Sequence, residues 1–173
     1  DEGISGAVHV GIEPGSEFKY SGGGYTLLQL LVEEVTGQSF AAYMKESIFQ
    51  PLNMTYSSYT FQDSSAFRLA EFYNSDGTKA EHYRYTSLAA TSLYTSLSDL
   101  ETFFKVFLKG NDNEPIGRNV LQPETITTMR KPHASTMGID IWGLGTILFA
   151  PTNNGDFIIG HDGKSTPPIN TAI

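Results

Sequence analysis

Two adjacent patterns near the start of the chain contain side chains that could do chemistry. Tyr20 and Ser21 precede three consecutive glycines, residues 22–24, and an amphipathic helical pattern follows directly. A phenol on a tight turn at the mouth of a cleft can act as a general base or a hydrogen-bond relay. It does so only where nearby cations favour its phenolate, because the ordinary pKa of tyrosine is about 10. The alternative is a buried aromatic side chain whose hydroxyl caps the next helix.

The second pattern is Ser16-x-x-Lys19, which fits the S-x-x-K spacing of a serine acylase. Such a pair works when both side chains lie on one face of a helix, one turn apart, so that the amine can take the hydroxyl proton. Pro14 and Gly15 precede the pair and residues 21–24 follow it, which disfavours a helix through Ser16. We therefore interpret this match as a polar loop that leads into Tyr20.

Nucleotide and metal sites are not supported by the residues present. Residues 163–165 read Gly-Lys-Ser, as at the end of a phosphate-binding loop, but Ile158 occupies the position that requires glycine, and Pro167 and Pro168 follow instead of a helix. The histidines are isolated in the sequence, without an HExxH pattern or paired carboxylates: His9, His82, His133 and His161. We expect neither a metal nor a cofactor.

The composition restricts the class of partner. The 173 residues carry a formal net charge of −8, which disfavours nucleic acid and anionic membranes because phosphate binding needs a basic face. Hydrophobic residues make up 39%, enough for one folded domain with a buried core. The absence of cysteine excludes thiolate catalysis, and no apolar run approaches the ~20 residues that span a bilayer.

Helical periodicity recurs through the first two thirds of the chain and predicts four helices. Each has a recognisable start or stop residue. The first is expected from Tyr25 to a stop at Gly37, and the second from the cap Ser39 to about Gln50. The third follows a capping box of Ser98 and Glu101, and the fourth runs from Pro123 to about Arg130. The apolar face of the third helix consists of Leu100, Phe103, Phe104, Phe107 and Leu108.

The last third is rich in β-forming residues. Residues 142–149 and 156–160 flank the turn sequence 151–155 and predict an antiparallel hairpin, and a shorter hairpin is expected around residues 74–77 within the loop 55–86. Helices before strands indicate an α+β fold. We expect a single partial domain over residues 1–173, mainly helix and loop over 1–138 and strands over 139–173. Because the chain starts at Asp1 and its last five residues alternate like a strand in progress, we expect a piece of a longer protein.

These stretches together resemble the serine β-lactamase and penicillin-binding-protein superfamily, above all its class C β-lactamase, esterase and D-aminopeptidase-like branch. PGSEFKYSGGGYTLLQLLVEEVTGQSFAAYMKESIFQPLNM is similar to that branch's P-G-x-x-F-x-Y-S-N-x-G-Y, helix, V-T-G, helix and P-L-G-M. SLYTSLSDLETFFKVFL, LQPETITTM, WGLGTILF and GHDGKSTPPINTAI follow in the family order, so the resemblance runs from about Gly11 to the C-terminus.

The resemblance implies a β-lactamase/transpeptidase-like fold and hydrolysis of an ester, amide or peptide through an acyl-serine, without metal or cofactor. Tyr20 would be the catalytic tyrosine, and His161, Asp162 and Gly163 the third motif, with His161 in the catalytic set. The residues implied to contact a small-molecule or peptide substrate are Gly22, Asp162, Gly163 and Lys164, and the Lys164 N–H would face the oxyanion. A periplasmic or secreted location is also implied.

Three departures from the family pattern bear on activity. Gly22 stands where the family usually has the substrate-contacting Asn, and Asp162 replaces Thr or Ser, which disfavours anionic substrates such as penicillins. The family's S-x-x-K serine belongs upstream of Tyr20, so we expect this chain alone to be inactive and to need the missing remainder of its fold as partner. Two alternatives stay open: a non-catalytic binding protein with a decayed site, and an unrelated helical interaction domain in which Tyr20 and His161 lie far apart.

Overall fold

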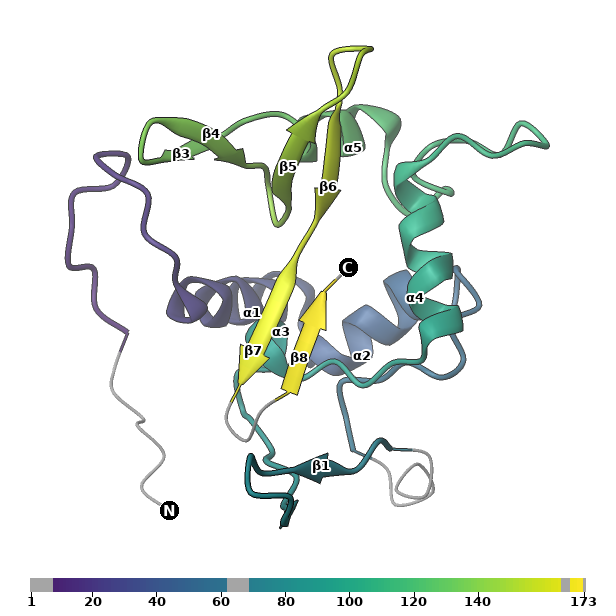
Figure 1. Cartoon of the computed structure of the whole chain (residues 1–173). Helices are drawn as coiled ribbons and strands as arrows, with labels where there is room; N and C mark the ends of the chain where they lie inside the picture. Colours follow the sequence, from purple (N-terminus) through teal and green to yellow (C-terminus); the bar gives the residue numbers. More distant parts are fainter. Residues whose placement is uncertain (1–7, 62–68, 166–168, 173) are drawn as a thin grey trace.

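A computed structural model of the chain describes residues 8–61, 69–165 and 169–172. Helices occupy the first two thirds and antiparallel strands the last third, which confirms the α+β prediction (Figure 1). Three predicted features fall partly outside the described residues: positions 62–68 of the loop 55–86, Pro167 and Pro168, and Ile173 at the end of the last strand. Within the described part of the chain, no helix is both long enough and apolar enough to cross a membrane.

The first two predicted helices are confirmed, with small differences at their ends. α1 (Gly22–Thr36) begins at the glycines because the Ser21 hydroxyl accepts a 3.0 Å hydrogen bond from the N–H of Gly24, and it ends at Gly37 in the left-handed conformation. Ser39 caps α2 (Phe40–Met44), which continues directly into the π-helical η1 (Lys45–Phe49). The predicted helix from Ser39 is therefore one helix with a π-helical second half.

The third helix starts earlier than predicted. The cap of α4 (Leu97–Phe104) is Ser96 and not Ser98, because the Ser96 hydroxyl accepts from the N–H of Asp99 at 3.2 Å. This start places the Asp99 carboxylate, 5% exposed, against the N–H of Tyr56 at 2.7 Å and the hydroxyl of Ser57 at 2.8 Å. A start at Ser98 would not give the helix this link to the loop before it.

The end of the same helix also differs from the prediction. α4 passes into the 3-10 helix η3 (Lys105–Phe107), and Leu108 then adopts an extended conformation. Leu108 was expected on the apolar face, but it is 58% exposed because helical geometry stops at Phe107. The fourth helix, α5 (Pro123–Met129), matches its prediction closely.

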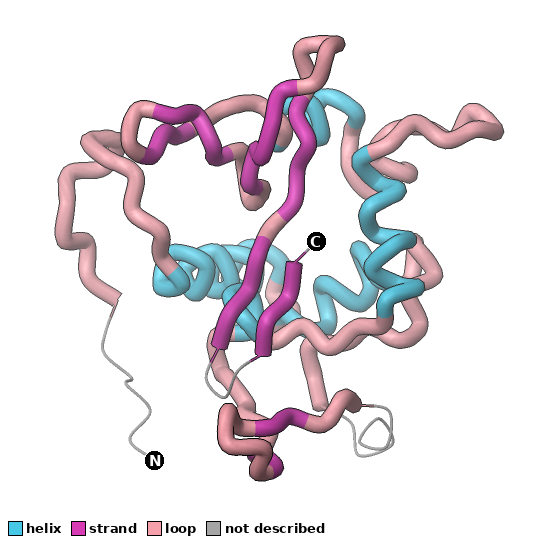
Figure 2. The backbone as a smooth tube through the Cα atoms, viewed as in Figure 1, coloured by secondary structure: helices cyan, strands magenta, loops and turns pink. Residues whose placement is uncertain are grey.

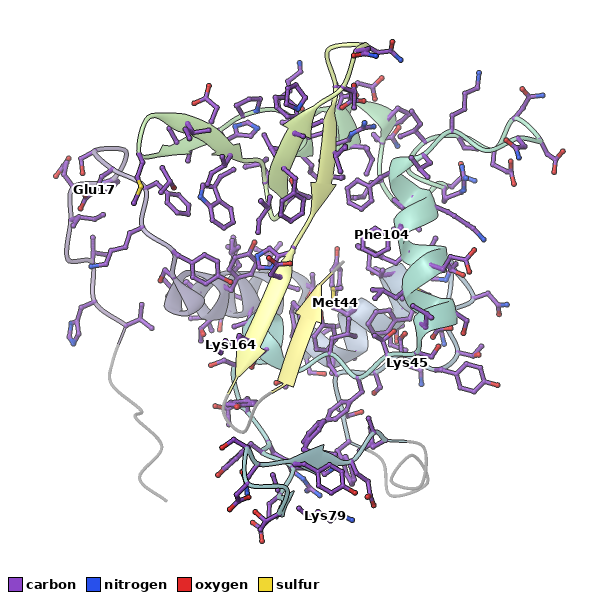
Figure 3. All side chains as sticks on the ribbon, viewed as in Figure 1. Glu17, Met44, Lys45, Lys79, Phe104 and Lys164 are labelled. Atoms are coloured by element: carbon purple, nitrogen blue, oxygen red, sulfur yellow. The ribbon has the colours of Figure 1, made fainter. Side chains whose placement is uncertain are left out.

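The core lies where η1 and the segment after it meet η3, at the end of α4, and α5. Met44 and Phe104, labelled in Figure 3, pack against this core from α2 and α4, and Ile159 packs against it from the sheet. The core cluster consists of six buried side chains: Phe49, Leu52, Met54, Val106, Phe107 and Ile126.

Six strands follow the helices, and their first four form one antiparallel sheet in chain order. These are β3 (Ala134–Thr136), β4 (Ile139–Trp142), β5 (Ile147–Pro151) and β6 (Phe157–Gly160). The predicted hairpin is confirmed as β5 and β6, with Ile147 opposite Gly160 and a register shift between Leu148 and Ala150. The predicted run 142–149 is interrupted at residues 143–146, where Gly145 has a positive φ of 73°.

The chain passes from β6 to β7 with one residue, His161, between them. β7 (Asp162–Ser165) pairs antiparallel with β8 (Ile169–Ala172) as a separate two-stranded sheet, which runs in front of the helices in Figure 1. An ion pair between Arg130 and Asp156 joins the end of α5 to the β5–β6 turn, and Arg130 also donates to the Phe107 carbonyl at 3.2 Å. The sheet is thus fastened to the helical core.

Two small elements complete the fold. β1 (Phe72–Tyr73) and β2 (Lys79–Ala80) form the short hairpin expected around residues 74–77. α3 (Leu88–Thr91), which was not predicted, lies beside α1, where the Gln29 side chain accepts from the N–H of Ala89 at 3.2 Å. Figure 2 shows how much of the backbone between these elements is loop, including the stretch from residue 8 into α1.

Candidate active site

Tyr20 lies at the end of the loop that enters α1. The side chain of the next residue, Ser21, is committed to capping the helix, so Tyr20 itself is not the cap and its ring is 64% exposed. The alternative in which Tyr20 is a buried capping aromatic is therefore wrong. The phenol is available for contact with a second molecule.

His161 lies against Tyr20, although the two residues are far apart in the sequence. Their ring centroids are 6.2 Å apart with the planes tilted by 41°. His161 is brought there by the β5–β6 hairpin, and Tyr20 by the start of α1. The interaction-domain alternative required these residues to lie far apart, so the structure contradicts it.

Two further rings complete the group, and the sequence analysis did not select them as site residues. Trp142 at the end of β4 has its ring centroid 5.7 Å from that of Tyr20 and 6.2 Å from that of His161. Phe18 stacks on Trp142 at 4.8 Å. We call Phe18, Tyr20, Trp142 and His161 the aromatic cluster. A sequence signal did exist, because Phe18 and Tyr20 have the i, i+2 spacing of one face of an extended segment.

The hydrogen bonding of His161 fixes its neutral tautomer. Its Nδ1 lies 2.6 Å from the backbone carbonyl of Asp162, and a carbonyl can only accept, so Nδ1 carries the proton. The Nε2 lone pair of the neutral ring can then accept a proton from a bound group. This arrangement suits His161 to proton transfer or to hydrogen bonding with substrate.

A second tyrosine lies close to the cluster. Burial raises the pKa of the Tyr25 phenol, and the neighbouring Tyr20 phenolate would raise the pKa of Tyr25 further. Both influences favour the protonated form of Tyr25, so its phenol is kept as a hydrogen-bond donor. Its hydroxyl lies beside Gly145 in the β4–β5 turn.

Gly22 is the first residue of α1, and no steric demand explains the glycine. A Cβ built at this position would meet no heavy atom within 4 Å, and the backbone is not in the left-handed region. An asparagine would therefore fit here. Packing therefore does not require a glycine at this position.

The remaining predicted site residues follow His161 along β7. Asp162, Gly163 and Lys164 are exposed and stand opposite Ala172, Thr171 and Asn170 of β8 in the strand register. Lys164 is labelled on this strand in Figure 3. The structure thus places them next to His161 in the chain, on a regular strand that can offer backbone N–H groups.

Ser16 lies in a turn and not in a helix. Its hydroxyl donates to the Glu13 carbonyl at 2.6 Å, and its N–H donates to the same carbonyl at 3.1 Å. The helical geometry that a Ser-x-x-Lys pair needs is therefore absent at Ser16 and Lys19.

A separate groove of about 920 Å³ lies away from the aromatic cluster, between α2, the loops at residues 55–61 and 94–96, and the start of α4. Hydroxyl side chains make up most of its wall, and neither Tyr20 nor His161 lines it. Within the described residues, no three His, Asp or Glu side chains gather in a way that would hold a metal ion.

Comparison with known proteins gives a consistent result. Residues 6–172 match the family model described as Beta-lactamase. Protein flp of Staphylococcus aureus (strain MRSA252) is 26% identical over 155 residues, which cover 87% of this chain and 29% of that protein. The mouse mitochondrial serine beta-lactamase-like protein LACTB is 30% identical over 139 residues, 72% of this chain and 24% of that protein. The chain thus spans less than a third of the curated relatives that it matches.

The solved structure of a class C beta-lactamase superposes with a TM-score of 0.73 at 15% identity, over 96% of this chain and 51% of that one. At this identity the likeness concerns the fold alone. It confirms the predicted β-lactamase/transpeptidase-like fold, of which the chain contains a part.

Proposed function

The chain belongs to the beta-lactamase family, and on this premise we propose that it is the central part of a serine hydrolase that cuts an ester, amide or peptide bond. One observation carries the proposal: the family's tyrosine and its third motif, which the sequence places at Tyr20 and His161, lie with their rings 6.2 Å apart. A reaction that needs several groups at one carbonyl requires this convergence.

The proposed chemistry is acyl transfer in two steps. A serine hydroxyl attacks the substrate carbonyl carbon, its proton passes through Tyr20 to the leaving group, and an acyl-serine forms. Water then attacks the acyl-serine, its proton passes through Tyr20 to the serine oxygen, and the bond between the acyl carbon and that oxygen breaks to release the acid. The N–H of Lys164 on β7 is the proposed donor to the oxyanion of both tetrahedral intermediates.

The serine of this mechanism lies outside the 173 residues in our proposal. Ser16-x-x-Lys19 is the one S-x-x-K match in the sequence, and its serine sits in a turn. We therefore expect the isolated chain to be inactive towards nitrocefin and p-nitrophenyl esters. Turnover by the chain that Ser16→Ala abolishes would contradict this part of the proposal.

The surface of α1 supports the view that further chain completes the site. None of its residues is buried among the described residues, and Leu27, Leu28, Leu30 and Leu31 are 48–56% exposed. Adjacent exposed leucines of this kind are normally covered by another part of the fold. We propose that the remainder of the same β-lactamase-like fold covers α1 and supplies the serine beside Tyr20.

The choice of substrate follows from the charge next to His161. Asp162 is exposed on β7, and its carboxylate disfavours a substrate with a carboxylate at that point. We therefore propose a neutral or cationic small molecule or peptide as substrate, in preference to a penicillin. Exchange of Asp162 for threonine in the full-length protein should then raise the rate with nitrocefin more than the rate with a neutral ester.

The test of the proposed function uses the full-length protein that contains this chain. A fluorophosphonate probe should label a serine outside these 173 residues, and p-nitrophenyl ester turnover should fall strongly on Tyr20→Phe, which removes the phenol and keeps the ring. Tyr56→Phe, an exposed tyrosine outside the aromatic cluster, is the matched control. Unaltered turnover in Tyr20→Phe would refute the role of Tyr20.

A non-catalytic binding protein is the second candidate, and the observation that favours it is Gly22, where the fold would accept an asparagine that the sequence lacks. This alternative predicts that the full-length protein binds a substrate analogue but is labelled by neither fluorophosphonate nor penicillin probes. Labelling that depends on Tyr20 would exclude it.

A further inference from the structure

We propose that Trp142 is a positioning residue of the candidate active site, which ties the loop carrying Tyr20 to the sheet carrying His161. Its predicted effect on catalysis rests on the proposed function. Its effect on the geometry of the two rings does not, because that effect follows from contacts within the chain.

Trp142 occupies the centre of the aromatic cluster. Its ring contacts Phe18 at 4.8 Å, Tyr20 at 5.7 Å and His161 at 6.2 Å between centroids. The other described ring contact within the cluster is the one between Tyr20 and His161. Removal of the indole therefore takes away three of the four ring contacts at once.

The indole itself is held in place by a hydrogen bond. Its Nε1–H donates to the Thr136 hydroxyl at 3.0 Å, across the β3–β4 hairpin. The backbone of the same hairpin is paired from Ala134 to Trp142. A ring fixed by the sheet at one end can act as a rigid support for rings carried by a loop.

The loop before α1 contacts the Trp142 indole through two side chains. Phe18 stacks nearly parallel on the indole, with an interplanar angle of 19°, and Tyr20 meets it at 47°. Side chains at i and i+2 of an extended segment share one side, so both rings reach Trp142 without a change in the backbone. The exposed loop is thus fastened to β4 immediately before the helix begins.

Hydrogen bonds do not replace this support. Among the described residues, the Tyr20 hydroxyl has no hydrogen-bond partner, and His161 bonds through Nδ1 to the carbonyl of its own neighbour, Asp162. No hydrogen bond joins the two rings directly in the described structure. Their mutual approach depends on ring contacts, of which those to Trp142 are the most numerous.

The experiment measures ring proximity directly. In the 173-residue chain, an NMR cross-relaxation peak between the Tyr20 and His161 ring protons should be present in the wild type, lost in Trp142→Leu and retained in Trp142→Phe, which keeps an aromatic ring. Thr136→Val should shift and broaden the indole N–H signal of the chain's single tryptophan. Phe149→Leu, an exposed aromatic on the neighbouring strand, is the matched control and should leave the peak intact.

Methyl signals of Ile126 in the core cluster show whether each variant is folded. If these signals persist and the Tyr20–His161 peak also persists in Trp142→Leu, the proposal is wrong. If Trp142→Leu does not fold, Trp142→Phe and Thr136→Val decide: the proposal requires the peak to survive in the first and the indole signal to change in the second.

A kinetic arm in the full-length protein separates the two proposals. A misplacement of about 1 Å can lower a rate by roughly a hundredfold, so Trp142→Leu should lower kcat by at least about tenfold with little change in KM, while Trp142→Phe stays within about threefold of wild type. An inactive wild type refutes the proposed function and leaves the NMR result to decide the role of Trp142. An active wild type with unchanged kcat in Trp142→Leu refutes the positioning role alone.

Discussion

Two helical regions of this chain have similar sequence patterns but very different surroundings. α4 with its extension η3, and α5, lie at the core cluster, where Ile126 is 1% exposed. α1 is longer and contains four leucines, yet none of its residues is buried. Periodicity thus reveals that a helix has an apolar face, but not whether the same chain covers that face.

The difference matters because the candidate active site belongs to the uncovered region. Tyr20 precedes the start of α1, on the left in Figure 1, whereas α4, which leads into the core residues of η3, lies on the right. The stability of the chain and the completion of its site are therefore separate problems. Substitutions in the two regions should behave differently, and the following predictions test this.

The largest effect is expected in the core cluster. Ile126→Ala should lower the free energy of unfolding by roughly 2–5 kcal/mol, since it removes buried methyl groups and leaves a cavity. Urea unfolding of the chain measures it. Leu31→Ala on α1 is the matched substitution and should change the value by less than about 0.5 kcal/mol. Equal losses in the two variants would remove the distinction between the regions.

A smaller effect is expected at the buried carboxylate that starts α4. Asp99→Asn should destabilise the chain by roughly 1–3 kcal/mol, because the Tyr56 N–H and the Ser57 hydroxyl lose a charged acceptor. Glu101→Gln, on the exposed side of the same helix, should cause no measurable change. A neutral result for Asp99→Asn would show that the cap and its link to the loop contribute little.

Polar substitutions on the exposed face of α1 should have different effects in the isolated chain and in the full-length protein. In the isolated chain, Leu28→Gln with Leu31→Gln should alter the free energy of unfolding by no more than about 0.5 kcal/mol and should reduce binding of the dye ANS. In the full-length protein the same pair should be clearly destabilising, because the proposed remainder of the fold covers the face there. Similar behaviour in both proteins would contradict the proposed cover over α1.

The smallest effect concerns pH and the β1–β2 hairpin, which belongs to neither region. A hydrogen bond from Lys79 lowers the pKa of Glu71, with a further contribution from the Tyr73 hydroxyl, and the same contact raises the pKa of Lys79. A lowered carboxyl pKa means that the contribution is present above the ordinary value of 4.5 and is lost as the pH falls through the folded-state pKa.

Amide exchange in the hairpin should therefore speed up slightly below pH 4.5, relative to Lys79→Met, in which the Glu71 partner is already gone. For Lys79 the sign is reversed: its contribution is complete below its ordinary pKa of 10.5 and disappears only as the pH rises above that value. Both groups are exposed, so the change should stay local, without a shift in the global unfolding midpoint.

Local chemistry explains which parts of the fold could be predicted from the sequence. Gly37 and Pro123 mark helix ends through their own backbone restrictions, and the β5–β6 hairpin follows from its turn residues. The cap at Ser96 was missed because Ser98 offers an equally good local pattern. The choice between them depends on the contact of Asp99 with Tyr56, which is a tertiary interaction.

The residues of the candidate active site also fall into those that the sequence could predict and those that it could not. Tyr20 and His161 were selected from family motifs, and the structure brings their rings together. Trp142 and Phe18 were missed because their importance arises from packing between distant segments. The i, i+2 spacing of Phe18 and Tyr20 indicates that they share a face, but it does not show which distant ring packs against that face.

The passage from β6 to β7 has a consequence for how such a protein can change in length. Ile159 packs against the core cluster, and His161 follows it by two residues. Because side chains alternate along an extended chain, the two side chains lie on the same side of it. One inserted or deleted residue between them would place the imidazole on the opposite side of the strand. Insertions at the 152–155 turn carry no such penalty. Natural variants should therefore keep an even spacing between the core residue Ile159 and His161.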